Sequence, residues 1–200
     1  STQDNGYRPL GNLIRHVGCV TDLGNRVATA SKRVAPPAPT TQTYTKTFTY
    51  TGLGTYQYAW SNWASGEWGN RAIQGVWETY GNKSGHIFFN ISEIRSFIGS
   101  GTVQSGTITL TRRNGGGYSS ATNIYLNAST ASSASGTPSY ANGTHIGSLA
   151  WGATGTFTLP TAIINNLKSG TYNSLACYSS SNTSDYAEIV SASITIKETK

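Results

Sequence analysis

Aromatic and polar side chains are interleaved in the stretch from Trp60 to Tyr80, which contains four of the five tryptophans of the chain. Flat aromatic rings stack on the apolar C–H faces of sugars, while neighbouring amides and charged groups bond to the sugar hydroxyls. We therefore predict a glycan-binding site in this stretch, extended by tyrosines at two further loop tips. The predicted glycan-binding residues are Trp63, Trp68, Asn62, Glu67, Arg71, Tyr118 and Tyr140.

The tryptophans of this stretch divide into two groups. Trp60 and Trp77 fall on predicted strands, and tryptophan is largely buried on average, so we expect these two in the core. Trp63 and Trp68 fall in a loop predicted for residues 61–70, and binding residues concentrate in loops. The loop tryptophans are therefore the ones expected to contact a ligand.

Catalysis is the weaker interpretation of the same stretch. Hydrolysis of a glycosidic bond needs two carboxyl groups at a fixed separation. The chain has eight carboxylates, and Glu67 and Glu78, which lie in and after the tryptophan loop, are the only suggestive pair. Surface carboxylates are mostly solvated, and the sequence lacks a GxSxG nucleophile motif and a phosphate-binding loop. We predict that the protein is not an enzyme.

Metal, cofactor and nucleic-acid sites have no support in the sequence. The three histidines lack metal-ligand spacing to cysteines or carboxylates. The formal net charge is +6, but the basic residues are scattered, and nucleic-acid-binding segments are far richer in Lys and Arg. No apolar run is long enough for a membrane span. We therefore predict no metal, no cofactor, no nucleic-acid partner and no membrane insertion.

Residues 44–200 are predicted to form an all-β domain. Ser, Thr, Asn and Gly are abundant, and apolar residues alternate with polar ones between glycine-rich turns. A turn over residues 81–85 and a long loop over residues 127–143 are expected between strands. About eight to ten short strands of this kind are typical of a jelly roll or β-sandwich. The predicted strands cover residues 44–50, 56–60, 72–77, 87–89, 107–111, 118–126, 145–151, 155–159, 171–179 and 186–197.

Two short helices are expected between these strands. Ser92 is predicted to cap the first helix, and Pro160 stands near the start of the second. We expect both helices to close the open ends of the sandwich and to bury one apolar face each. The apolar faces consist of Ile94, Phe97 and Ile98 in the first helix and of Ile163, Ile164 and Leu167 in the second.

The first part of the chain differs from the β domain. Residues 1–34 form an arm, and residues 35–43 form a Pro/Thr-rich linker that favours an extended, stiff spacer. Apolar residues of the arm follow steps of four and three, which leaves two forms open, a docked irregular arm and a short helical stalk. The arm is too small to hold a core, so we predict that it docks or oligomerises. The arm residues predicted to do so are Tyr7, Pro9, Leu13, Val17, Val20 and Val27.

Four segments share a strand-and-turn pattern, namely Gly85–Phe89, Gly106–Arg112, Gly115–Tyr118 and Phe157–Pro160. With the pattern of residues 44–197 as a whole, they resemble the jelly-roll modules of bacteriophage tail and accessory virion proteins. The resemblance implies a non-enzymatic virion structural protein, such as a minor tail, fibre or decoration protein, that is anchored by its arm. The implied partners are other virion proteins, bound through the arm, and glycans of the host surface.

The sequence also leads to expectations about the location, the oligomeric state and an alternative function of the protein. The implied location is the virion, after synthesis in the host cytoplasm, because the start of the sequence lacks the basic-then-apolar order of a signal peptide. The stalk-like spacing of the arm predicts a homo-oligomer, specifically a trimer. Similar modules also occur as carbohydrate-binding domains of secreted bacterial enzymes, which is the alternative function.

Overall fold

The computed structural model describes residues 31–181 and 184–200. Of its two compact units, Ser1–Thr40 and Thr41–Lys200, the second contains every helix and strand of the described residues. Residues 31–42 are exposed and form neither helix nor strand. No described helix is long and apolar enough to cross a membrane. The predicted arm residues Tyr7, Pro9, Leu13, Val17, Val20 and Val27 lie outside the described residues.

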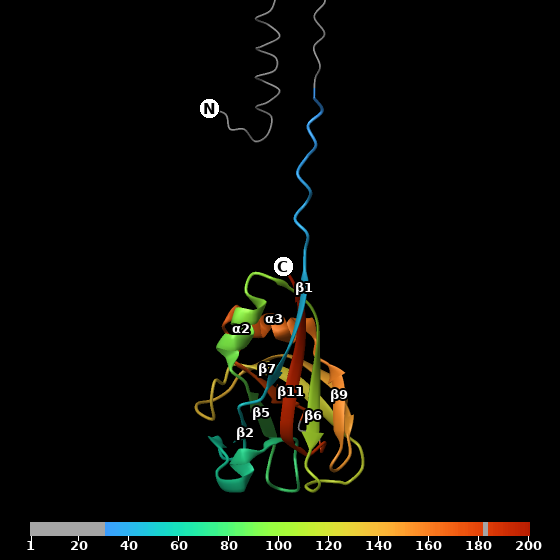
Figure 1. Cartoon of the computed structure of the whole chain (residues 1–200). Coiled ribbons are helices and arrows are strands. Elements are labelled where there is room, and N and C mark those ends of the chain that lie inside the picture. Colours follow the sequence, from blue (N-terminus) through green and yellow to red (C-terminus); the bar gives the residue numbers. More distant parts are fainter. Residues whose placement is uncertain (1–30, 182–183) are drawn as a thin grey trace, which may run out of the picture. The chain divides into compact units, whose positions relative to one another are not determined.

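The unit Thr41–Lys200 is a β-sandwich of two antiparallel sheets with two short helices (Figure 1). The first sheet has the order β1 (Thr43–Thr49), β11 (Ala187–Thr199), β6 (Thr102–Arg112) and β9 (Thr154–Thr158), and β4 (Ala72–Gln74) also pairs with β11. The second sheet has the order β3 (Asn62–Trp63), β2 (Gly52–Gln57), β5 (Lys83–Phe88), β10 (Ser174–Cys177), β7 (Thr122–Ser129) and β8 (Tyr140–Leu149). The predicted all-β sandwich with two short helices is therefore confirmed.

The pairing of β6 with β11 shows how the alternating sequence builds the core. Ile108 lies opposite Ile194, and both side chains are fully buried between the sheets. The intervening threonines face outward, and Thr109 Oγ1 bonds to Thr156 Oγ1 of β9 at 2.8 Å. Successive side chains of a strand point to opposite faces of the sheet. In a sheet with one buried face, an alternating sequence therefore places its apolar side chains in the core and its hydroxyl pairs on the surface.

The helices α2 (Ile91–Ile98) and α3 (Thr161–Ser169) form as predicted, but both lie at the same end of the sandwich (Figure 1). Arg95 Nε of α2 donates to the Leu167 carbonyl of α3 at 2.9 Å. Asn90, not Ser92, is the N-cap of α2, because its Oδ1 accepts from Glu93 N at 3.3 Å. The loops around β4 lie at the opposite end of the sandwich (Figure 1).

Several predicted boundaries are wrong for physical reasons that the structure makes plain. Lys83 begins β5 inside the predicted turn 81–85, because Gly85 lets β5 approach β4 so closely that a Cβ would collide with the backbone of Ala72. Both ends of the predicted loop 127–143 pair as β7 and β8. The predicted linker also ends too late, since Thr43 already pairs with Thr199.

Candidate functional site

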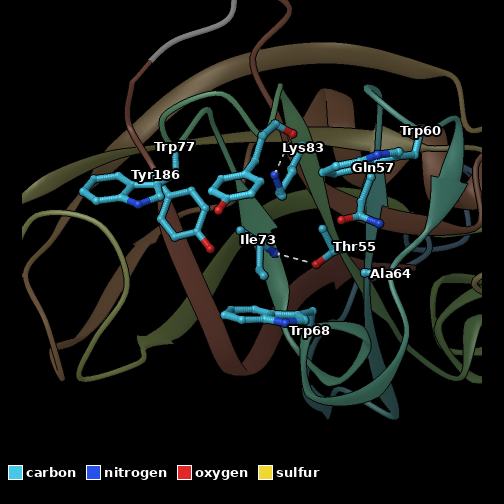
Figure 2. A pocket seen from close by; sticks show the side chains of 10 residues that line it. Thr55, Gln57, Trp60, Ala64, Trp68, Ile73, Trp77, Lys83 and Tyr186 are labelled. Carbon is cyan, nitrogen blue, oxygen red and sulfur yellow. Dashed lines mark hydrogen bonds between the residues drawn. The ribbon is translucent and has the colours of Figure 1, made fainter.

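A cleft of about 510 Å³ opens among the loops around β4. These loops lie at the end of the sandwich away from α2 and α3 (Figure 1). The volume of the cleft is in the range of small-molecule sites, and half of its lining residues are aromatic. Figure 2 shows Trp68 on one side, Trp60 and Lys83 on the opposite side, and Trp77 beside Tyr186 at one end. We define this aromatic cleft by its lining residues: Thr55, Gln57, Trp60, Ala64, Trp68, Ile73, Trp77, Tyr80, Lys83 and Tyr186.

Thr55 of β2 fixes the chain at the centre of the aromatic cleft. Its buried hydroxyl donates to the Arg71 carbonyl at 2.7 Å and accepts from the Ile73 amide at 3.0 Å. Its own carbonyl accepts from the Ala64 amide at 2.8 Å. One strand residue thus holds both ends of the segment that carries Trp68, which includes the short 3₁₀ helix η1 (Gly66–Asn70).

The loops on either side of β4 contain backbone conformations that residues other than glycine rarely adopt. Ser61, in the turn after β2, has φ of 50°, and Glu78, in the loop before β5, has φ of 52°. Each such residue costs on the order of 1 kcal/mol, and it persists where the surroundings fix it. In the second loop, Gly75 has φ of 87°, and a Cβ there would collide with the backbone of Asp185. The loop that carries Trp77 and Tyr80 is therefore held against the chain before β11.

A buried carboxylate supports two aromatic side chains of the cleft. Trp68 is 46% exposed, and the Arg71 guanidinium lies over its ring with 4.9 Å from Cζ to the centroid. Arg71 Nη1 in turn donates to Glu188 Oε1 at 2.8 Å. The Tyr186 hydroxyl donates to Glu188 Oε2 at 3.2 Å. Burial, together with the charge of Glu188, raises the pKa of Tyr186, so the phenol keeps the proton that it donates.

Lys83 is the only charged residue among the ten that line the aromatic cleft. It is 7% exposed, and its Nζ donates to the carbonyls of Tyr80 at 3.2 Å and Gly81 at 3.4 Å. The same nitrogen lies 5.8 Å from the ring centroid of Trp60 and 5.9 Å from that of Tyr80. Burial lowers the pKa of Lys83 below the ordinary lysine value. The cleft thus combines aromatic walls with one buried amine.

Of the predicted glycan-binding residues, Trp68 is the one that lines the aromatic cleft. Asn62 is exposed beside it, and its Oδ1 accepts from Gln57 Nε2 at 3.0 Å. Glu67 is exposed and pairs with Arg71 at 3.4 Å between Oε2 and Nη2, and Arg71 supports Trp68. These three polar residues therefore position cleft residues or lie next to them.

The predicted division of the tryptophans holds for Trp68 but not for the other three. Trp60 is 52% exposed and lines the aromatic cleft together with Trp77, whereas Trp63 is half-buried and its Nε1 donates to the Gly136 carbonyl at 2.7 Å. The reason is that β2 ends at Gln57, so the following turn carries Trp60 out of the sheet. The chain then returns as β3 and pairs Trp63 with Tyr56.

Tyr118 lies outside the aromatic cleft but extends its aromatic surface. It is 66% exposed, and its ring lies edge-on to Trp77 with 5.3 Å between centroids. Arg112, at the end of β6, is fully buried, and its Nη2 donates to the Tyr118 carbonyl at 2.6 Å. The glycine-rich tip is therefore tied down beneath an exposed ring.

Tyr140 was predicted in an exposed loop, but it is half-buried on β8 and lies outside the aromatic cleft. Its hydroxyl donates to Ser84 Oγ at 2.6 Å and accepts from the Tyr58 hydroxyl at 2.8 Å. Its ring stacks on Tyr178 with 4.2 Å between centroids, and burial raises its pKa. Tyr140 lines a separate, more polar depression of about 570 Å³.

Lys83 and Tyr186 are among the cleft residues that the sequence-based prediction did not include. Lys83 fell in a predicted turn, and Tyr186 was placed at the start of the last predicted strand. The position of Lys83 directly before the strand segment Ser84–Phe88 was the available signal. Tyr186 had no local signal, because it reaches the cleft only through the pairing of β4 with β11.

The aromatic cleft offers ring faces for stacking, hydrogen-bonding groups and one amine. Its ten lining residues include no carboxylate, histidine or cysteine, so they offer no acid–base pair for glycoside hydrolysis. Within the described residues, no group of three or more His, Cys, Asp and Glu side chains is arranged to hold a metal ion. No protein-family model and no curated protein sequence matches the chain.

Proposed function

We propose that this protein is a non-enzymatic structural protein of a bacteriophage virion whose β-sandwich binds host surface glycans in the aromatic cleft. The observation that carries the proposal is the pair of exposed rings, Trp60 and Trp68, on opposite sides of one cleft, with Trp77 at its end. Opposed rings can stack on both faces of a sugar, while Gln57 and Lys83 supply polar atoms between them.

The exposed Tyr118 supports a ligand that is longer than one sugar. Its contact with Trp77 continues the aromatic surface beyond the cleft, onto the glycine-rich tip. A chain of sugars can therefore run from the cleft across Trp77 to Tyr118, with one aromatic ring available to each of several residues. This geometry favours oligosaccharides over monosaccharides.

Replacing Trp68 by alanine is expected to lower the affinity for a bound oligosaccharide by about 30-fold, since a central aromatic anchor contributes about 2 kcal/mol. Trp60→Ala is expected to have a similar effect. The measurement is a glycan array with the full chain, followed by calorimetric titration of the glycans that bind. Tyr44→Ala is the matched control, because Tyr44 is an exposed aromatic residue (41%) on β1 and lies outside the cleft. Equal losses in all three variants, or unchanged binding in both cleft variants, would refute the proposed site.

The virion part of the proposal is supported by the organisation of the chain. A proline-rich segment, residues 35–41, precedes a sandwich that is a compact unit of its own. Such an arrangement suits a domain that is displayed on a particle by a docked arm. A carbohydrate-binding module of a secreted bacterial protein is the alternative, and the aromatic cleft would serve it equally well.

Removal of residues 1–40 distinguishes these two functions. We expect Thr41–Lys200 to unfold with the same midpoint as the full chain, because all described strands and helices lie within it. We also expect the truncated protein to be missing from phage particles that are assembled in its presence. Full-length Trp68→Ala is the control and should be incorporated normally. Normal incorporation of the truncated protein would contradict the docking role of the arm.

A further inference from the structure

We propose that the aromatic cleft selects acidic saccharides, and that Lys83 binds the carboxylate of a uronic or sialic acid residue. This inference rests on the proposed glycan-binding function and narrows it to one chemical class. The observation behind it is a buried ammonium group that reaches the cleft without a carboxylate partner.

The hydrogen bonds of Lys83 leave one donor free for a ligand. An ammonium group has three N–H donors, and within the described residues Nζ donates to two carbonyls, of Tyr80 and Gly81. Both bonds are long, at 3.2 and 3.4 Å. The amino group lies on the Trp60 side of the cleft, facing the space in front of Trp68 (Figure 2). A ligand atom in that space can therefore accept the third hydrogen bond.

The charges around the cleft favour an anion at this point. None of the ion pairs among the described residues involves Lys83. Glu188, the buried carboxylate that supports the cleft, is bonded to Arg71 and Tyr186, so its charge is already paired with Arg71. A buried charge is costly unless it is paired. A carboxylate ligand would supply the missing partner and form a charge-assisted hydrogen bond.

The two aromatic contacts of Lys83 fit the same role. Its ammonium is close to the faces of Trp60 and Tyr80, which stabilise a cation partly without consuming a donor. The lowered pKa of Lys83 is what burial without an anionic partner produces. A bound carboxylate would reverse this effect, so ligand binding and full protonation of the amine support each other.

The test uses the full chain and a panel of oligosaccharides derived from polygalacturonate, alginate, heparosan and polysialic acid. Each is paired with its carboxyl-reduced counterpart, which has the same ring stereochemistry and no charge. We expect binding of at least one acidic member and a loss of about tenfold or more on carboxyl reduction, as for one charged hydrogen bond. Lys83→Met should remove this preference, while Lys83→Arg should retain most of it.

The outcomes separate this inference from the function on which it rests. Equal affinity for acidic and carboxyl-reduced saccharides would overturn the role of Lys83 and leave glycan binding intact. Acid selectivity that persists in a folded Lys83→Met variant would also overturn it. Binding of none of the saccharides on this panel or on the glycan array would refute the proposed function itself. The comparison of reduced and unreduced ligands on the unmodified protein does not depend on whether Lys83→Met folds.

Discussion

Acidification from about pH 7 to about pH 4 is expected to lower the free energy of unfolding of the sandwich by roughly 3 kcal/mol through a single histidine. His86 is fully buried on β5, and burial lowers its pKa from 6.5 to about 3. The unfolded chain therefore takes up a proton as the pH falls through about 6.5, whereas the folded protein does so only near its own lower pKa. Within this window the unfolded state binds more protons, so the stability present above pH 6.5 is lost as the pH falls.

The surroundings of His86 explain why the folded protein resists protonation. Its ring nitrogens bond to Ser84 Oγ at 3.0 Å and Ser129 Oγ at 3.2 Å, and Tyr140 OH lies 3.3 Å from Nε2. The rings of Trp63 and Phe88 pack against it. All of these neighbours are neutral, so no carboxylate among them compensates an imidazolium.

Urea unfolding at a series of pH values measures this effect. Other groups also titrate in acid, so the informative quantity is the difference in pH dependence between variants. His86→Gln should flatten the decline in stability between about pH 6.5 and about pH 4, even if it is less stable overall. His145→Gln, at an exposed position on β8, should leave the decline unchanged. The same pH dependence in His86→Gln and the unmodified protein would contradict the assignment.

Replacing Glu188 by alanine should cost about 3 kcal/mol of unfolding free energy and should also weaken glycan binding. Glu188 is 1% exposed, and its removal leaves the Arg71 guanidinium, whose side chain is 14% exposed, without its closest anion. It also leaves the Tyr186 hydroxyl without its acceptor. Removing one partner of a buried ion pair is strongly destabilising because the other charge stays buried. The binding loss follows because Arg71 and Tyr186 hold two sides of the cleft.

A matched control for this variant lies on the same arginine. Glu67 also pairs with Arg71, but its side chain is 67% exposed, so Glu67→Ala should change stability by less than about 0.5 kcal/mol. The free energies of unfolding of both variants are compared by chemical unfolding that is monitored by tryptophan fluorescence. Comparable losses in the two variants would show that Arg71 does not depend on its buried partner.

The sheets and helices were predictable because their signals are local. Strict alternation around Ile108 and Ile194 marks two paired strands, and the apolar faces of α2 and α3 follow helical spacing. Local signals led to a wrong prediction where one residue type occurs in two kinds of structure, as glycine does in turns and at close contacts between strands. Gly85 was predicted as part of a turn, although it serves the close approach of two strands.

The candidate site was predictable only in its neighbourhood. The density of tryptophan identified the correct stretch. The side of the chain on which each ring emerges depends on where β2 ends, and for this reason the predicted roles of Trp60 and Trp63 were exchanged. Charged residues were predicted at the surface, so the buried Lys83 and Glu188 were not recognised as parts of the site. Their burial depends on tertiary pairing, which one sequence does not reveal.

The most direct test of saccharide binding in the aromatic cleft follows the tryptophan indole N–H signals in nitrogen-15 NMR spectra while the tightest-binding oligosaccharide is added. Each of the five signals is assigned by a Trp→Phe substitution. We predict shifts at Trp60, Trp68 and Trp77, which line the aromatic cleft, and unchanged signals from Trp63 and Trp151. Shifts confined to Trp63 or Trp151, with the three cleft signals unmoved at saturation, would contradict saccharide binding in the aromatic cleft.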